Sequence, residues 1–216
     1  TRYALLITKP ITKKRNPDYF SLWSFWPYLR LRRAPRERSS LTTTTRKLWM
    51  LFFEDKDDDK ALKLVDKQLD ETPDHLDSRF LRAKIYWRAD KYDAVLRDLS
   101  YVIKHYKGKP SVYKSTPFGL QGAIYDDMER FADAVDSYRQ DIKFAKKDNP
   151  DRIQSYKFDL AQSLYNAKDL DGAEKVYFDM LKDDPRDGGA MVGLARNILD
   201  QNKYEEGLEW LRKAEF

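Results

Sequence analysis

An acidic run around residue 57 is the sequence's candidate for a metal site. It contains Glu54, Asp55, Asp57, Asp58 and Asp59. The aspartates at 55, 57 and 59 match the first three ligand positions of a calcium-binding loop. Such a loop requires Gly at its sixth position and Glu at its twelfth, where this chain has Lys60 and Asp66. We therefore interpret the run as a solvated turn in which one aspartate caps the following helix.

Other catalytic or metal-binding arrangements have no support in the sequence. His75 and His105 are the two histidines, and neither has a His, Cys or carboxylate partner at ligand spacing. The chain has no cysteine, which excludes disulfides and thiolate metal sites. It also lacks a phosphate-binding loop, a nucleophile elbow and a paired-carboxylate motif. We expect a non-enzymatic protein with no metal, no cofactor and no small-molecule substrate.

The chain contains an internal sequence repeat, and this repeat predicts the helices on which the residues above lie. Three copies share the gaps between a small residue, an aromatic or aliphatic residue and a second small residue. They contain Gly122, Tyr125, Phe131, Ala134, Val135 and Tyr138; Ala161, Leu164, Leu170, Ala173, Tyr177, Leu181 and Pro185; and Ala195, Ile198, Tyr204, Gly207, Leu208, Leu211 and Ala214. Each copy predicts two amphipathic helices. A period in the thirties indicates a helical solenoid.

The small residues predict close contact between the two helices of each copy. We expect Gly122 to face Ala134 and Ala161 to face Ala173, with the later aromatic filling the next gap. The segment 166–171 breaks the helical pattern, and Pro185 ends the second helix of its copy. The apolar residues of the last copy, Leu208, Trp210 and Leu211, lack a polar capping helix. We expect either that the natural chain continues or that a partner covers these residues, and we favour the partner.

These residues resemble the tetratricopeptide repeat, which places a Leu-Gly or Leu-Ala pair before a Tyr, followed by Ala, an aromatic residue and Pro. The best copy reads LAQSLYNAKDLDGAEKVYFDMLKDDP. The resemblance covers about five repeats over residues 43–216, with Val95 and Trp49 at two positions that are normally small. It implies an all-α helical-hairpin solenoid, a tetratricopeptide-like superhelix.

The net charge of +5 is unevenly distributed. Residues 1–41 carry ten Lys or Arg against two acidic residues, a net charge of +8, whereas residues 42–216 carry −3. The first segment matches no repeat, and its four prolines exclude a long helix. We therefore divide the chain into an extended, basic and aromatic N-terminal arm, 1–41, and a repeat domain, 42–216.

The arm combines aromatic side chains with arginines. Its expected anchor residues are Trp23, Phe25, Trp26, Tyr28, Arg30, Arg32, Arg33, Arg36 and Arg38. Three partners fit this composition: neighbouring protein subunits, anionic lipid at a membrane surface, and ribosomal RNA. The acidic repeats and the abundance of Trp and Phe favour protein or lipid over a pure phosphate ligand.

The resemblance implies a concave groove lined by the first helix of each repeat. The corresponding partner-binding residues are Leu81, Ile85, Arg88, Leu120, Ile124 and Asp127, continued in the later repeats by Tyr156, Asp159, Ser163, Asn166, Asn197 and Asp200. The apolar members can equally belong to the core. Repeats that bind chaperone tails need Asn after the small residue, and the residues there are Met50, Lys84, Ala123, Gln162 and Arg196. We therefore do not expect chaperone binding.

The sequence thus predicts a non-catalytic scaffold for protein–protein interaction. We expect a structural subunit of a large mitochondrial, membrane-associated complex of the respiratory or ATP-synthase type, without a transmembrane helix. The start at Thr1 fits either a cleaved targeting peptide or a shortened sequence, so the mitochondrial expectation rests mainly on the arm. Two alternatives remain: a mitochondrial ribosome subunit whose arm contacts rRNA, and a free adaptor that binds a peptide in its groove.

Overall fold

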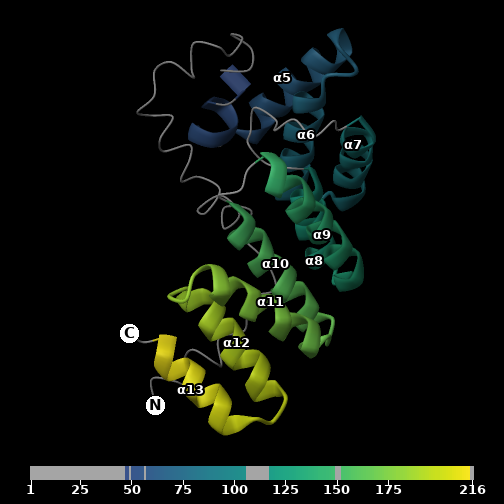
Figure 1. The fold of residues 1–216 in the computed structure, drawn as a ribbon. Coiled ribbons are helices and arrows are strands. Elements are labelled where there is room, and N and C mark those ends of the chain that lie inside the picture. Colours follow the sequence, from purple (N-terminus) through teal and green to yellow (C-terminus); the bar gives the residue numbers. More distant parts are fainter. Residues whose placement is uncertain (1–46, 49, 56, 106–116, 149–151, 215–216) are drawn as a thin grey trace. The chain divides into compact units, whose positions relative to one another are not determined.

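The computed structural model describes residues 47–48, 50–55, 57–105, 117–148 and 152–214, whose regular structure is helical (Figure 1). The arm, including all of its predicted anchor residues, and Trp49 lie outside this part. In chain order the elements are the π-helical turn η1 (Met50–Glu54), α5 (Asp58–Glu71), α6 (Leu76–Arg88), α7 (Tyr92–His105), α8 (Pro117–Asp127), α9 (Phe131–Asp148), α10 (Ile153–Asn166), α11 (Leu170–Asp183), α12 (Gly188–Asp200) and α13 (Tyr204–Ala214).

The described residues form two compact units. One contains the helices that end at His105, together with Pro117, and the other starts at Phe118. In the first unit, α6 packs against both α5 and α7. In the second, α10 packs between α9 and α11, and α12 packs between α11 and α13. Successive helices therefore form antiparallel hairpins, as the repeat pattern predicts. The predicted break at 166–171 and the helix end before Pro185 are confirmed by the bounds of α10 and α11.

The turns that follow α6, α8, α10 and α12 each contain one residue with a left-handed backbone. These residues are Asp90 (φ 54°), Glu129 (φ 58°), Lys168 (φ 67°) and Asn202 (φ 63°). The next residue donates its backbone N–H to a carbonyl five residues earlier, for example Asp169 to Leu164 at 2.9 Å. This bond is the Schellman ending of a helix, which satisfies carbonyls that the helix leaves without a partner. The sequence repeat is thus also a repeat of backbone conformation.

Aspartates begin several of the helices. The carboxylates of Asp57, Asp169 and Asp187 accept backbone N–H groups of the first turns of α5, α11 and α12 at 2.9–3.0 Å. The side-chain and backbone hydrogen bonds from Lys60 lower the pKa of Asp57. The prediction that one aspartate of the acidic run caps a helix is therefore confirmed.

Large aromatic side chains fill the core beside glycines. The Tyr177 ring lies against Gly193 of the next repeat, where a Cβ atom would come within 2.5 Å of the ring. The predicted role of this aromatic in filling the next gap is thus confirmed at Tyr177. The equivalent Tyr138 instead packs on Gly122 of its own hairpin. Both tyrosines are fully buried, so the glycines are needed for the close approach of neighbouring helices.

The described residues show neither a membrane-spanning helix nor a metal-binding cluster. No helix in this part of the chain combines the length and apolarity needed to cross a bilayer. Within the same residues, no group of three or more His, Cys, Asp or Glu side chains has a metal-binding arrangement. Asp58 of the acidic run instead pairs with Arg88 at 2.6 Å.

Candidate interaction surface

Polar contacts join the first helices of successive repeats in the unit that starts at Phe118. Ser163 of α10 donates its hydroxyl to the Asp126 carboxylate of α8, at 2.7 and 2.9 Å from the two oxygens. Asp126 also accepts the Tyr138 hydroxyl of α9 at 3.1 Å. Ser163 is fully buried. Because a buried hydroxyl needs a partner, this contact fixes how α8, α9 and α10 pack together.

A second group of polar contacts joins α10 to α12. The Tyr165 hydroxyl donates to the Asp200 carboxylate and accepts from Nε of Arg196 at 3.1 Å. The Arg196 guanidinium also lies 4.6 Å from the centre of the Tyr165 ring. Burial and the Asp200 carboxylate raise the pKa of Tyr165, so it stays a neutral hydrogen-bond donor. Acid, base and aromatic groups therefore stand together on the first helices of this unit.

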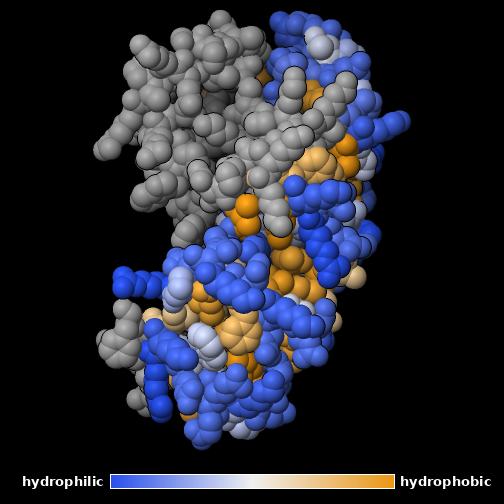
Figure 2. Space-filling model, in the orientation of Figure 1, coloured by the Kyte–Doolittle hydropathy of each residue, from blue (hydrophilic) through white to orange (hydrophobic). Residues whose placement is uncertain are grey.

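The accessible surface of these helices is polar with smaller apolar areas. Figure 2 shows mostly hydrophilic side chains over this unit, interrupted by apolar surface near α10 and α12. The residues that end α8, α10 and α12 are Asp127, Asn166 and Asp200, and they occupy the same register of the repeat. Asp127 and Asn166 are half-buried and Asp200 is exposed. This row of helix ends could contact another molecule through hydrogen bonds and charge.

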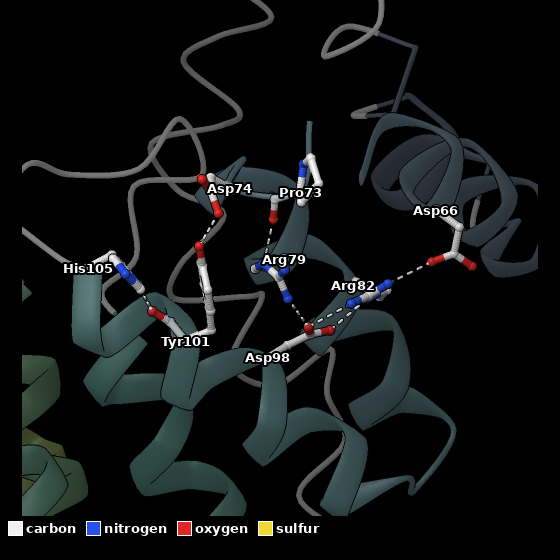
Figure 3. Close-up of polar contacts among 8 residues, drawn as sticks. All are labelled: Asp66, Pro73, Asp74, Arg79, Arg82, Asp98, Tyr101 and His105. Atoms are coloured by element: carbon white, nitrogen blue, oxygen red, sulfur yellow. Dashed lines mark hydrogen bonds and ion pairs between the residues drawn. The ribbon is translucent and has the colours of Figure 1, made fainter. Parts of the chain in front are cut away.

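In the unit that ends at His105, a charged network joins three helices (Figure 3). Arg82 of α6 binds Asp98 of α7 through two hydrogen bonds of 2.8 Å and Asp66 of α5 at 2.9 Å. The Asp98 side chain is only 4% exposed, whereas Asp66 is 45% exposed. Hydrogen bonding to Asp98 raises the pKa of Arg82. The network is therefore a permanent ionic link between α5, α6 and α7.

The same network reaches the turn that precedes α6. Arg79 contacts Asp98 at 3.4 Å, donates to the Pro73 carbonyl at 2.9 Å and lies 4.0 Å from the centre of the Tyr101 ring. The Tyr101 hydroxyl in turn donates to Asp74, as Figure 3 shows. Each of these polar side chains already has a partner within the protein. We therefore interpret the cluster as a rigid link between helices.

Comparisons with known proteins identify the fold. No protein-family model matches the chain, and no curated protein matches it. Solved structures do: MamA has a TM-score of 0.66 at 13% identity, covering 81% of this chain and 93% of MamA. YrrB, described as a TPR protein with an unusual peptide-binding site, has a TM-score of 0.63 at 17% identity, covering 79% of this chain and 82% of YrrB. The chain has the tetratricopeptide-repeat fold.

A third match is yeast Tom70, with a TM-score of 0.59 at 20% identity. It covers 79% of this chain but 35% of Tom70, so the tetratricopeptide-repeat region corresponds to part of a longer protein there. These likenesses agree with the all-α hairpin repeats predicted from the sequence.

The structure places the predicted groove residues of the tetratricopeptide repeats in two different environments. Four apolar ones are core side chains with at most 4% exposure: Leu81, Ile85, Leu120 and Ile124. Tyr156, Ser163 and Asn197 are also buried. This burial agrees with our alternative interpretation of the apolar positions as core. Asp127, Asp159, Asn166 and Asp200 keep accessible surface.

Arg88, the remaining predicted groove residue, contacts the first hairpin. Its guanidinium donates to the Phe52 carbonyl at 3.2 Å and lies 3.8 Å from the centre of the Phe52 ring, in addition to its pairing with Asp58. Arg88 therefore connects the end of α6 to η1 and α5. Whether any of these residues contacts a partner stays a prediction.

Sequence reasoning missed the Arg82 network and the Tyr165 cluster. One signal was available for the first. Asp98 lies among Val95, Leu99 and Val102, which form the buried stripe of α7. An acidic residue that stays ionised on a buried helix face requires a basic partner, so the pattern implied an arginine or lysine near Asp98. It did not indicate which one.

Proposed function

We propose that this chain is a non-catalytic scaffold for protein–protein interaction, and that the row of helix ends Asp127, Asn166 and Asp200 contacts its partner. The observation that carries the proposal is the set of polar contacts joining α8, α10 and α12. These contacts hold the first helices in a fixed register, so the row is organised before a partner arrives. A preorganised surface loses less conformational entropy on binding.

The finer proposal is a structural subunit of a large mitochondrial complex at a membrane, of the respiratory or ATP-synthase type, anchored by the arm. Its support is the composition of residues 1–41, where Trp, Phe and Tyr accompany ten basic residues. Such residues suit contacts to neighbouring subunits and to anionic lipid headgroups.

Sedimentation of the complex from gently solubilised organelles tests this finer proposal. The full chain and a chain lacking residues 1–41 are compared, with and without ribonuclease. We expect the full chain to sediment with a large particle that resists ribonuclease, and the shortened chain to lose it. Collapse of the particle on ribonuclease treatment would instead support a mitochondrial ribosome subunit whose arm contacts rRNA. Sedimentation as a small free protein would contradict membership of any assembly.

A free adaptor that binds a peptide in the groove is the second candidate. The structural likeness to YrrB, a TPR protein described as having a peptide-binding site, favours it. An adaptor of this kind would sediment alone and bind an isolated peptide, so the same experiment separates the two candidates.

A further inference from the structure

A carboxylic acid occupies a core position in the third repeat. Counting from the second small residue of each hairpin, Asp141 of α9 matches Val102 of α7 and Met180 of α11, with Gln68 of α5 and Ala214 of α13 at the same position. The side chains of Asp141 and of the apolar Val102 and Met180 are buried, and Asp141 is fully so. Because acidic residues are rarely buried completely, the full burial of Asp141 requires an explanation beyond packing.

The neighbouring helix makes room for the acid. Gly119 of α8 faces the Asp141 carboxylate, and a Cβ atom at this glycine would overlap one of the carboxylate oxygens. Glycine weakens a helix relative to alanine. Gly119 therefore leaves room for the buried Asp141 carboxyl group, although a glycine at this position lowers the stability of α8.

Among the residues that the structure describes, the charges that act on Asp141 belong to α10 and to the residue that precedes it. Arg152, at the start of α10, is 8% exposed and attracts the carboxylate, whereas Asp159 repels it. Gly119, which faces it from α8, contributes no titratable group. Burial outweighs the attraction of Arg152 and raises the pKa of Asp141 well above its ordinary value. The environment thus favours a neutral carboxylic acid over a carboxylate.

We propose that Asp141 is a pH-responsive switch between the third and fourth repeats. In its neutral form it packs like the apolar residues at the same position, and α8, α9 and α10 are held tightly together. In its ionised form the buried charge loosens this packing. The inference goes beyond the proposed function. It concerns how firmly α8 and α10, which carry Asp127 and Asn166 of the row of helix ends, pack against α9.

The sign of the effect follows from proton linkage. A folded-state pKa above the unfolded value gives stability that is fully present below the unfolded value of about 3.8. That stability is lost as the pH rises through the raised pKa. Acidification from neutral pH should therefore tighten this part of the fold.

Thermal unfolding of the full chain between pH 4.5 and 8.5 tests the switch. The variants are Asp141→Asn, which cannot ionise, and Asp136→Asn, a control on the exposed side of α9 where the acid side chain is 80% exposed. We expect the unfolding midpoint of Asp141→Asn to match wild type near pH 4.5 and to exceed it by at least about 3 °C at pH 8. Asp136→Asn should follow wild type throughout. Parallel curves for Asp141→Asn and wild type would overturn the proposal.

A measurement on the wild-type chain keeps the test independent of the variant's folding. The carboxyl carbon of Asp141 is followed by NMR as a function of pH, together with amide exchange of α8, α9 and the first turn of α10. We expect a titration above the ordinary aspartate range and, across that pH interval, exchange that becomes faster in these helices than in α12. Titration near pH 3.8, or exchange in these helices that does not change with it, would refute the switch.

Discussion

At the scale of single residues, the hairpin turns contain built-in strain. Asp90, Glu129, Lys168 and Asn202 all adopt the left-handed region, which disfavours every residue with a Cβ atom and is least costly for Asn and Gly. None of the four is glycine, although glycine is the usual residue at this point of a helix ending. The turns are therefore sites where the protein can be stabilised.

Replacing Glu129 by Gly should stabilise the chain by about 1 kcal/mol, because the left-handed backbone no longer clashes with a side chain. Asn202→Gly should give a smaller gain, since Asn tolerates this conformation and its side chain accepts the Tyr204 hydroxyl at 2.8 Å. Urea unfolding of both variants measures the difference. Equal losses of stability in the two variants would contradict the assignment of strain.

At Gly193, in contrast, replacing the residue present should destabilise the fold. A Cβ atom there would lie 2.5 Å from the Tyr177 ring, and this ring is fully buried. Gly193→Ala should therefore cost roughly 1–3 kcal/mol through overpacking. Gly188→Ala is the matched control on the same helix, because nothing lies within 4 Å of its added Cβ. If thermal unfolding shows both substitutions to be neutral, the proposed close contact is absent.

At the scale of elements, Arg82 connects α5, α6 and α7 through acids of very different burial. Its bond to Asp98 is shielded from water, whereas its bond to Asp66 is largely solvated. Removing one partner of a buried ion pair leaves an uncompensated charge, which is far more costly than losing a surface pair. We therefore expect the Arg82–Asp98 pair to contribute more to the stability of this unit than the Arg82–Asp66 pair.

Arg82→Met should destabilise this unit by about 2 kcal/mol. This loss is smaller than the roughly 3–5 kcal/mol usual for breaking a buried pair, because Arg79 still contacts Asp98 at 3.4 Å and the Arg82 side chain is 22% exposed. Asp66→Asn should cost less than about 1 kcal/mol. The double variant Arg82→Met with Asp98→Leu should recover part of the loss in urea unfolding. A larger effect at Asp66 than at Arg82 would contradict this ranking.

The elements themselves were predictable from the sequence, whereas the ionic links between them were not. Pro185, the small residues and the capping aspartates act locally, so their positions determine where helices start and stop. The choice of Arg82 as the partner of Asp98 depends on how α6 and α7 rotate about their axes. That rotation results from packing, and no single-sequence pattern records it.

The candidate surface was predictable only in part, for a related reason. One residue along a helix corresponds to a rotation of about 100°, so a small error in register moves a side chain from the surface to the core. Leu81 and Ile85 were expected in the groove and are core residues. Asn166 and Asp200, at the ends of their helices, keep accessible surface.

At the scale of the whole molecule, we propose that the repeats present the row of helix ends Asp127, Asn166 and Asp200 to a partner. The fold determines the scaffold architecture, but fold alone does not determine function. The proposed role of the row Asp127, Asn166 and Asp200 can be tested without knowing the partner in advance.

The most direct measurement is quantitative recovery of stoichiometric partners by the tagged full chain from solubilised organelles. Asn166→Arg places a bulky cation in the partner-binding row, and Gln140→Arg makes the same change of charge on the exposed side of α9. We expect the Asn166→Arg chain to recover roughly tenfold less partner than wild type, with unchanged thermal unfolding. The Gln140→Arg chain should recover as much partner as wild type. Equal recovery by all three chains would contradict the claim that this row is the interaction surface.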